Sequence, residues 1–215
     1  MSVVRPEFGP TLPELLGPRL RALPRGAKIA LAVAALVVVL LAAKVLTGGG
    51  SGAKLHAVVV RAPVASNFVY RAPLHKLAQG KGELARVGAA NGQTFAVRPL
   101  RVAPYRGDAA GVLPVLASQL EDKMAGELPG FVLRYEGRVN VNRIQGYEMI
   151  FQYRRTGRLT YGRRILLLPT VTDTQGADLL LTSPRMPSVA RYDAIGRNGA
   201  LKTALRSFRF GTERP

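Results

Sequence analysis

The segment YEMIFQYRRTGRLTYGRRILLL, residues 147–168, decides the fold class of this chain. Large side chains alternate at Tyr147, Met149, Phe151 and Tyr153, which predicts a strand with one buried face. The Arg-Thr-Gly-Arg sequence at 155–158 predicts a tight turn into a second strand over 159–168. Because residues 165–168 are apolar on both faces, we expect this second strand to lie centrally, with a helix on each side.

The sequence before this hairpin predicts short strands at 57–61, 67–71, 84–87 and 94–102. A helix is predicted to follow, with Asp108 and Gly111 as start signals, Pro114 in its first turn and Leu128-Pro129-Gly130 ending it. Its apolar stripe comprises Val112, Leu113, Leu116, Leu120, Met124 and Leu128.

The remaining elements complete an α+β domain, an antiparallel β-sheet covered by helices. Phe131, Leu133 and Tyr135 alternate before a predicted turn at 136–137, and a turn at 173–176 leads into another strand at 179–181. We expect a second helical region from 187, a helix over 199–206 capped by Asn198, and a final strand at 207–210.

An apolar run at residues 29–46 predicts one transmembrane helix before this domain. It contains one charged residue, Lys44, which is close enough to one end to reach the headgroups. Eighteen helical residues rise about 27 Å, close to the ~30 Å thickness of the hydrocarbon core. A cleaved signal peptide is the alternative, although 28 residues precede the run and no small-x-small cleavage site follows it at the right distance.

Flanking sequences predict the membrane orientation and the remaining boundaries. Residues 1–28 are rich in proline, which predicts a disordered basic tail, and 47–54 form a Gly/Ser linker. Basic residues without an acid precede the run, at Arg19, Arg21, Arg25 and Lys28. The positive-inside rule therefore predicts a single-pass protein of the cell membrane, with the N-terminus cytoplasmic and the domain at 55–215 outside.

Charge gives the most specific binding hypothesis. The chain has 31 Lys+Arg against 13 Asp+Glu, a net charge of +18. Eight arginines crowd into one part of the sequence: Arg134, Arg138, Arg143, Arg154, Arg155, Arg158, Arg163 and Arg164. If those from 154 to 164 gather near the hairpin turn and its polar edges, they form a surface that attracts polyanions. For a domain outside the membrane, the nearest polyanions are anionic lipid and wall polymer.

No motif predicts catalysis, a cofactor or a metal site. The chain lacks cysteine, so thiolate chemistry is excluded. His56 and His75 have no acidic neighbour in sequence, and residues 172–178 supply too few oxygen ligands for an EF-type calcium loop. Nucleophile-elbow, Walker and dinucleotide-binding glycine patterns are absent from the sequence.

The order of elements resembles the PsbP-type fold of photosystem II extrinsic proteins and DcrB-like envelope lipoproteins. The resemblance covers residues 64–211 and depends on a strand at 68–73, a long helix, the hairpin from Gly146 to Leu168 and a terminal helix before Ser207. It implies a non-enzymatic accessory or binding domain at a membrane surface, and it transfers no functional residue. Such an outer domain would contact anionic lipid or wall polymer, or assist an envelope complex. Unlike the lipoproteins, this chain has no cysteine for lipidation.

Two other classes of function stay open at this point. Charge alone suggests a nucleic-acid-binding membrane protein, which would need its domain in the cytoplasm, and we do not expect it for an outer domain. An envelope hydrolase would need a cleft in which an acid, a base or a nucleophile converge, and no sequence motif marks one.

Overall fold

The computed structural model describes residues 24, 26, 54–103, 109–170 and 172–213. Ala53–Pro215 form one compact unit. The predicted transmembrane helix at 29–46 lies outside the described residues, as do nearly all of the predicted tail at 1–28 and of the linker at 47–54. In the described part of the chain, none of the helices has the length and apolar character needed to cross a bilayer.

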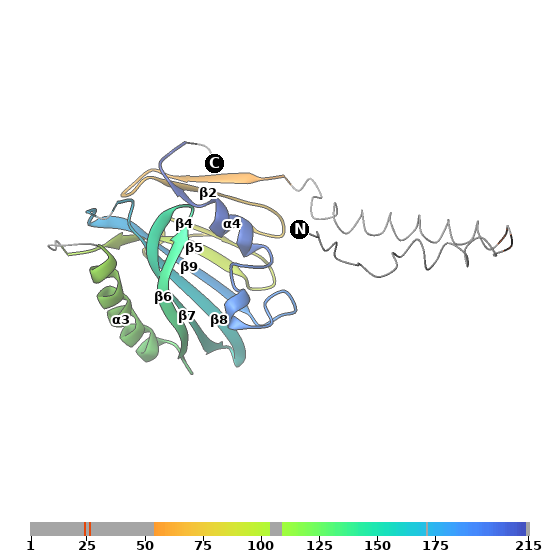
Figure 1. The fold of residues 1–215 in the computed structure, drawn as a ribbon. Helices are drawn as coiled ribbons and strands as arrows, with labels where there is room; N and C mark the ends of the chain where they lie inside the picture. The colour runs from red at the N-terminus through yellow and green to blue at the C-terminus, as the bar shows by residue number, and fades with distance from the viewer. Residues whose placement is uncertain (1–23, 25, 27–53, 104–108, 171, 214–215) are drawn as a thin grey trace, which may run out of the picture. The chain divides into compact units, whose positions relative to one another are not determined.

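A seven-stranded antiparallel sheet forms the centre of the domain, in the order β3-β4-β5-β9-β8-β7-β6 (Figure 1). Its strands are β3 (His75–Lys76), β4 (Ala85–Gly88), β5 (Thr94–Arg101), β6 (Val132–Val141), β7 (Ile144–Arg155), β8 (Arg158–Leu167) and β9 (Gln175–Pro184). The hairpin predicted at 147–168 is therefore confirmed as β7 and β8. β8 lies inside the sheet, because it pairs with β7 on one side and β9 on the other.

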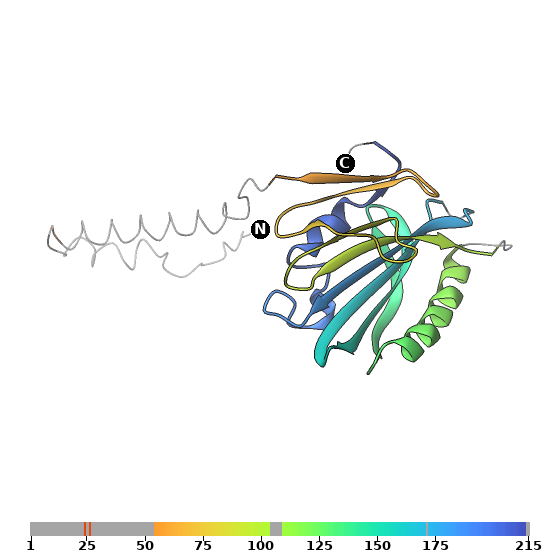
Figure 2. The same ribbon diagram turned by 180° about the vertical axis from the view of Figure 1, so that it is seen from behind.

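A second, three-stranded sheet has the order β1-β2-β10 and was not expected as a separate layer. Its strands are β1 (His56–Val60), β2 (Ser66–Tyr70) and β10 (Arg209–Phe210). The helices are α3 (Ala109–Glu127), the 3-10 turn η1 (Tyr192–Ala194) and α4 (Leu201–Ser207). Figure 2 shows α3 on one side of the large sheet and the small sheet with α4 on the other.

Two hydrophobic cores fill the spaces on the two faces of the large sheet. Leu166 and Leu168 pack with Leu113, Ala117 and Met124 of α3. Ile165 and Leu167 point the other way, since side chains alternate along a strand, and pack in the core that includes β2 and α4. A helix thus covers each side of β8 as predicted, and the small sheet completes the second cover.

The turn predicted at 136–137 is wrong. Gly137 lies inside β6 and pairs with Glu148 of β7. The chain turns instead at Asn142 and Arg143, whose φ angles are 49° and 70°. A two-residue hairpin turn with positive φ at both positions matches the right-handed twist of its strands, so local twist outweighed the glycine signal.

The second helical region predicted from residue 187 is also wrong. Residues 186–189 form an isolated bridge, and η1 is the short helical segment before α4. The helix predicted at 199–206 exists as α4, but Ala200 is its N-cap and Asn198 makes no cap. Pro114 lies inside α3, beyond its first turn, because the helix begins at Ala109.

Candidate polyanion-binding surface

The exposed end of the β7–β8 hairpin carries four arginines that we call the arginine tip. Its members are Arg154, Arg155, Arg158 and Arg185. The turn between the strands positions the first three, since Arg155 pairs with Arg158, and Thr156 and Gly157 have φ angles of 48° and 77°. Arg185 joins them because its backbone N–H donates to the Leu159 carbonyl at 3.0 Å. All four side chains are exposed, and none has an ion-pair partner within the described ranges.

Arg185 was missed by the sequence prediction because its strand was expected at 179–181 only. The structure extends β9 to Pro184, opposite Thr160 of β8. The residue that follows this strand therefore lies beside the start of β8. Extending the predicted strand by three residues would have placed Arg185 at the tip.

The expected gathering at the turn is wrong for Arg163 and Arg164, which lie in mid-strand. Arg163 is 6% exposed, and its Nε donates to Glu148 Oε2 at 2.7 Å and its Nη1 to the Ile195 carbonyl at 3.2 Å. Arg164 forms a bidentate pair with Asp178, its Nε lying 2.9 Å from Oδ1. Burial of a guanidinium requires an opposite charge, so these two arginines are neutralised inside the fold.

The remaining predicted arginines do not lie at the tip either. Arg143 occupies the β6–β7 turn, at the other end of β7. Arg134 lies at the register shift of the edge strand β6, and Arg138 pairs opposite Tyr147. These three side chains are exposed, so they add positive charge to other parts of the domain surface. The eight arginines therefore do not form one face.

A tyrosine marks the inner boundary of the tip. Burial raises the pKa of Tyr153, and the guanidinium of Arg155, which hydrogen-bonds its hydroxyl, opposes this rise. Tyr153 packs in the α3 core at 6.0 Å from the Phe151 ring centroid. The exposed Arg155 therefore lies close to the buried Tyr153.

Two groups around α3 and β6 have raised pKa values. Burial raises the pKa of Glu121, and the nearby charges of Glu136 and Asp122 raise it further. Tyr147 also has a raised pKa, from burial first and then from the charge and hydrogen bond of Glu136. Glu136 contributes to both shifts, so it lies close to Glu121 and Tyr147, on a strand that also carries the exposed Arg134 and Arg138.

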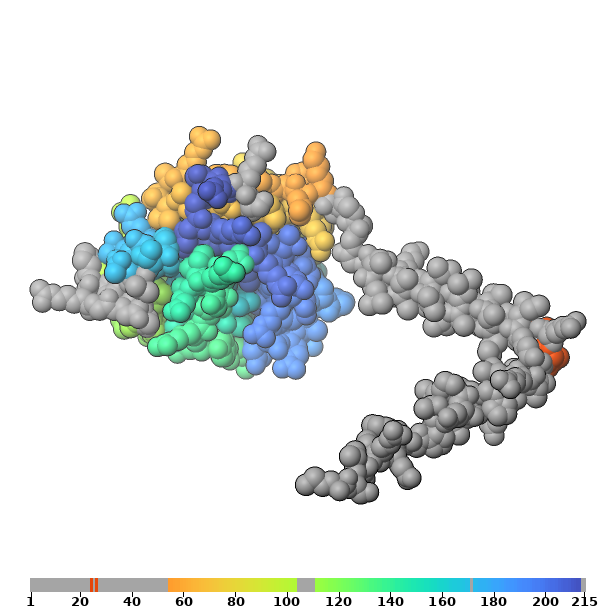
Figure 3. All heavy atoms as spheres, turned by 45° about the horizontal axis from the view of Figure 1, so that its top comes forward, coloured from red at the N-terminus to blue at the C-terminus, as the bar shows by residue number. Residues whose placement is uncertain are grey.

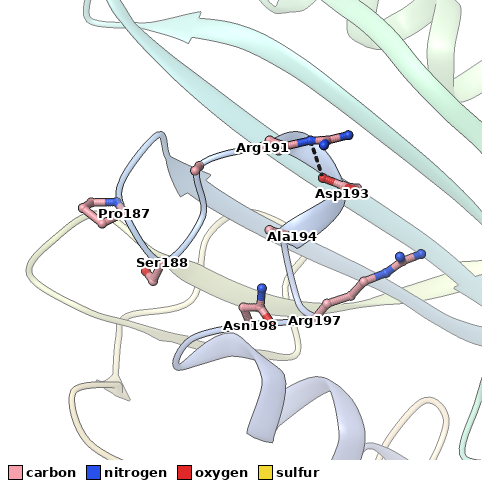
Figure 4. Close-up of a pocket in the computed structure, with 8 residues that line it drawn as sticks. Pro187, Ser188, Arg191, Asp193, Ala194, Arg197 and Asn198 are labelled. Carbon is pink, nitrogen blue, oxygen red and sulfur yellow. Dashed lines mark ion pairs between the residues drawn. The ribbon is translucent and has the colours of Figure 1, made fainter.

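An open pocket of about 350 Å³ is lined by residues 187–198, in the segment that connects β9 to α4 (Figure 4). Its polar lining includes Ser188, Arg191, Asp193, Arg197 and Asn198. Arg191 Nε is 3.4 Å from Asp193 Oδ1, and both arginine side chains extend away from Ser188. No histidine lines this pocket. Its residues therefore do not combine a nucleophile, a base and an anion-binding group at one point.

Neither the histidines nor the 172–178 loop forms a metal cluster. The His56 ring stacks on Tyr70 with centroids 5.3 Å apart, and His75 pairs with Gly88 at the sheet edge. Asp173 accepts a hydrogen bond from the Thr170 N–H at 2.9 Å, whereas Asp178 binds Arg164. No group of three or more His, Asp or Glu side chains able to hold a metal occurs within the residues that the structure describes.

Comparison with known proteins identifies similar solved structures but no family. No protein-family model and no curated protein matches the chain. Among solved structures, LpqN, involved in cell envelope biogenesis of Mycobacterium tuberculosis, is 12% identical, covers 73% of this chain and 91% of its own, with a TM-score of 0.49. Cyanobacterial PsbP (CyanoP) from Synechocystis sp. PCC 6803 is 14% identical, covers 75% and 96%, with a TM-score of 0.47. A PsbP protein is thus among the structural neighbours, as the sequence resemblance implies.

Proposed function

We propose that this chain is a membrane-anchored accessory domain of the cell envelope, without catalytic activity, that contacts anionic lipid through the arginine tip. The observation that supports this most directly is the tip itself. It presents four exposed guanidinium groups with no ion-pair partner among the described residues, whereas Arg163 and Arg164 form ion pairs with buried carboxylates. Guanidinium groups bind phosphate oxygens in a bidentate manner, which suits a phospholipid headgroup.

The proposed anchor makes lipid the first partner to consider. Residues 29–46 would cross the membrane, and an eight-residue Gly/Ser linker spans on the order of 16 Å. The domain would then stay within reach of the headgroups while remaining free to reorient. The positive charge of the tip would turn this end of the domain toward an anionic bilayer.

Protease protection tests the proposed topology. Intact cells expressing the full chain with a C-terminal tag are treated with an external protease. The proposal expects loss of the tag and survival of the N-terminal tail. A tag that is protected until the membrane is broken would refute an external domain and would favour the nucleic-acid-binding alternative.

Lipid contact is tested with a single fluorescent probe, since the chain has no cysteine of its own. Thr156→Cys places a dye at the tip, and the matched control Thr172→Cys places it in the exposed loop at the other end of β8. The full chain is reconstituted into vesicles that carry nitroxide-labelled headgroups. We expect stronger quenching at 156 than at 172 in anionic vesicles, and equal quenching in neutral ones. Equal quenching in both lipids would refute contact through the tip.

A further inference from the structure

Among the residues that the structure describes, the outer edge of β1 has no partner strand. β1 (His56–Val60) pairs with β2 and is the end strand in the order β1-β2-β10. In Figure 3 the orange segment, which contains both β1 and β2, lies at the surface on one side of the domain. An edge strand presents unpaired N–H and C=O groups, so natural proteins protect such edges or use them for binding.

Hydrogen bonds on the far side of β2 identify the backbone groups of β1 that face outward. The Val69 N–H donates to Ser207 Oγ at 2.9 Å, and the Gly211 N–H donates to the Ala65 carbonyl at 2.8 Å. Residues 65, 67 and 69 therefore direct their backbone groups toward β10 and α4, away from β1. In an antiparallel pair, two opposite residues either bond to each other or both direct their backbone groups away from the pair. Ala57 lies opposite Val69 and Val59 lies opposite Asn67. The backbone N–H and C=O groups of Ala57 and Val59 therefore point to the open side of β1.

The other edges in the described part of the chain have recognisable protection. β3 and β10 are two residues long. β6 has a register shift between Leu133 and Tyr135, and exposed charges at Arg134, Glu136 and Arg138. β1 has neither device: it has five residues, carries no Lys, Arg, Asp or Glu, and its Val59 is 40% exposed.

We propose that β1 binds an extended segment of another protein, with acidic residues at its ends, as an added antiparallel strand. Leu55 (59% exposed), Ala57 and Val59 share the outer face and would pack against alternate apolar side chains of that segment. Lys54 and Arg61 flank the strand, are exposed and lie in no ion pair among the described residues. The positive charges of Lys54 and Arg61 would favour a segment with acidic residues at its two ends.

A second copy of this chain is a poorer occupant of the same edge. Antiparallel pairing of two β1 strands would bring Lys54 and Arg61 of both copies together around one short ladder. Like charges close together in a sheet are destabilising. The charge at the ends of β1 therefore favours a partner that supplies carboxylates. This partner site goes beyond the lipid contact proposed above and uses a different surface.

The test uses the full chain in detergent micelles and a fluorescent probe peptide, EVTVTVE, whose binding is followed by anisotropy. The proposal expects saturable binding, and binding at least tenfold weaker for the matched peptide KVTVTVK. Two further peptides carry N-methyl groups on either the odd or the even backbone amides. One of them should bind at least tenfold more weakly and the other should bind unchanged, because only one edge of the peptide faces β1. Loss of two or three hydrogen bonds corresponds to roughly 10- to 100-fold in affinity.

Protein variants locate the site on β1. Val59→Pro removes an outward N–H and no β1–β2 hydrogen bond, so it should weaken EVTVTVE binding at least tenfold. Val59→Thr keeps the N–H and loses only part of the apolar contact, so it should weaken binding much less than Val59→Pro. If circular dichroism shows that Val59→Pro does not fold, the methylated peptides still test the proposal, because they leave the protein unchanged.

Three results would overturn the proposal. They are absence of saturable EVTVTVE binding, equal binding of the two methylated peptides, and quantitative disulfide-linked dimers of a Val59→Cys variant, which would identify a second copy as the occupant. The triple variant R154S/R155S/R158S should bind the peptide normally. The outcome of the peptide experiment is therefore independent of the outcome of the lipid experiment.

Discussion

Arg158 and Arg163 lie five residues apart on β8, yet the fold gives them opposite roles. Arg158 pairs opposite Arg155 at the exposed turn, and both side chains are in solvent. Arg163 lies under η1, bound to Glu148 and to the Ile195 carbonyl. A cluster of basic residues in a sequence therefore indicates a binding surface only where no carboxylate of a neighbouring strand neutralises it.

The largest effect is expected from breaking the buried pair. Arg163→Met leaves Glu148, which is 3% exposed, as an uncompensated buried charge and removes the donor to the Ile195 carbonyl. We expect the free energy of unfolding to fall by about 3–5 kcal/mol. Urea unfolding followed by circular dichroism measures it. The double variant with Glu148→Leu is the control: it should recover much of the loss, and failure to recover would show that the charge is not the cause.

A smaller loss is expected from the second pair. Asp178→Asn keeps the shape of the side chain but removes the charge that accepts the bidentate bond from Arg164. Because the Arg164 side chain is 12% exposed, water can partly solvate it, and we expect a loss of about 1–3 kcal/mol. The same urea experiment measures it. A loss equal to that of Arg163→Met would contradict the ranking by burial.

Stability should hardly respond to changes at the tip. The variant R154S/R155S/R158S removes exposed side chains that form no ion pair among the described residues, so we expect a change within about 0.5 kcal/mol. Thermal unfolding at matched salt measures it. A large loss would show that these arginines support the fold, and the contrast with Arg163 would then fail.

The smallest effect is expected at Glu121 of α3. The pKa of Glu121 is raised by burial, then by Glu136 and Asp122, so its charged form is disfavoured in the folded state. Its contribution to stability is present below pH 4.5 and is lost as the pH rises through the folded pKa. Glu121→Gln should therefore raise the melting temperature slightly at pH 7, and the gain should vanish near pH 3. A gain independent of pH would contradict a charge effect.

The sequence predicted the large sheet well because its strands alternate strongly. The period-two pattern of Met149, Phe151 and Tyr153 correctly placed β7, and the apolar run at 165–168 correctly placed β8 inside the sheet. The helical stripe that includes Leu116 and Leu120 correctly predicted α3. These signals are local, so one chain segment carries all the information they need.

The remaining features depend on contacts between distant segments. Glu148 lies fifteen residues from Arg163 and Asp178 fourteen from Arg164, and only the register of β7, β8 and β9 brings each pair together. The small sheet likewise needs β10 to return to β2, 142 positions earlier at Arg209 and Asn67. No pattern within a short window marks such pairings, which explains why the buried arginines were assigned to the surface.

One measurement tests the central claim most directly, that exposed arginines at the hairpin end hold the domain to anionic lipid. The quenching of the dye at 156 is recorded in full-length protein while the anionic fraction of the bilayer is raised, with and without R154S/R155S/R158S. At about 1 kcal/mol for each basic residue near such a surface, the triple variant should weaken contact on the order of a hundredfold. Identical curves for the two proteins would contradict the account.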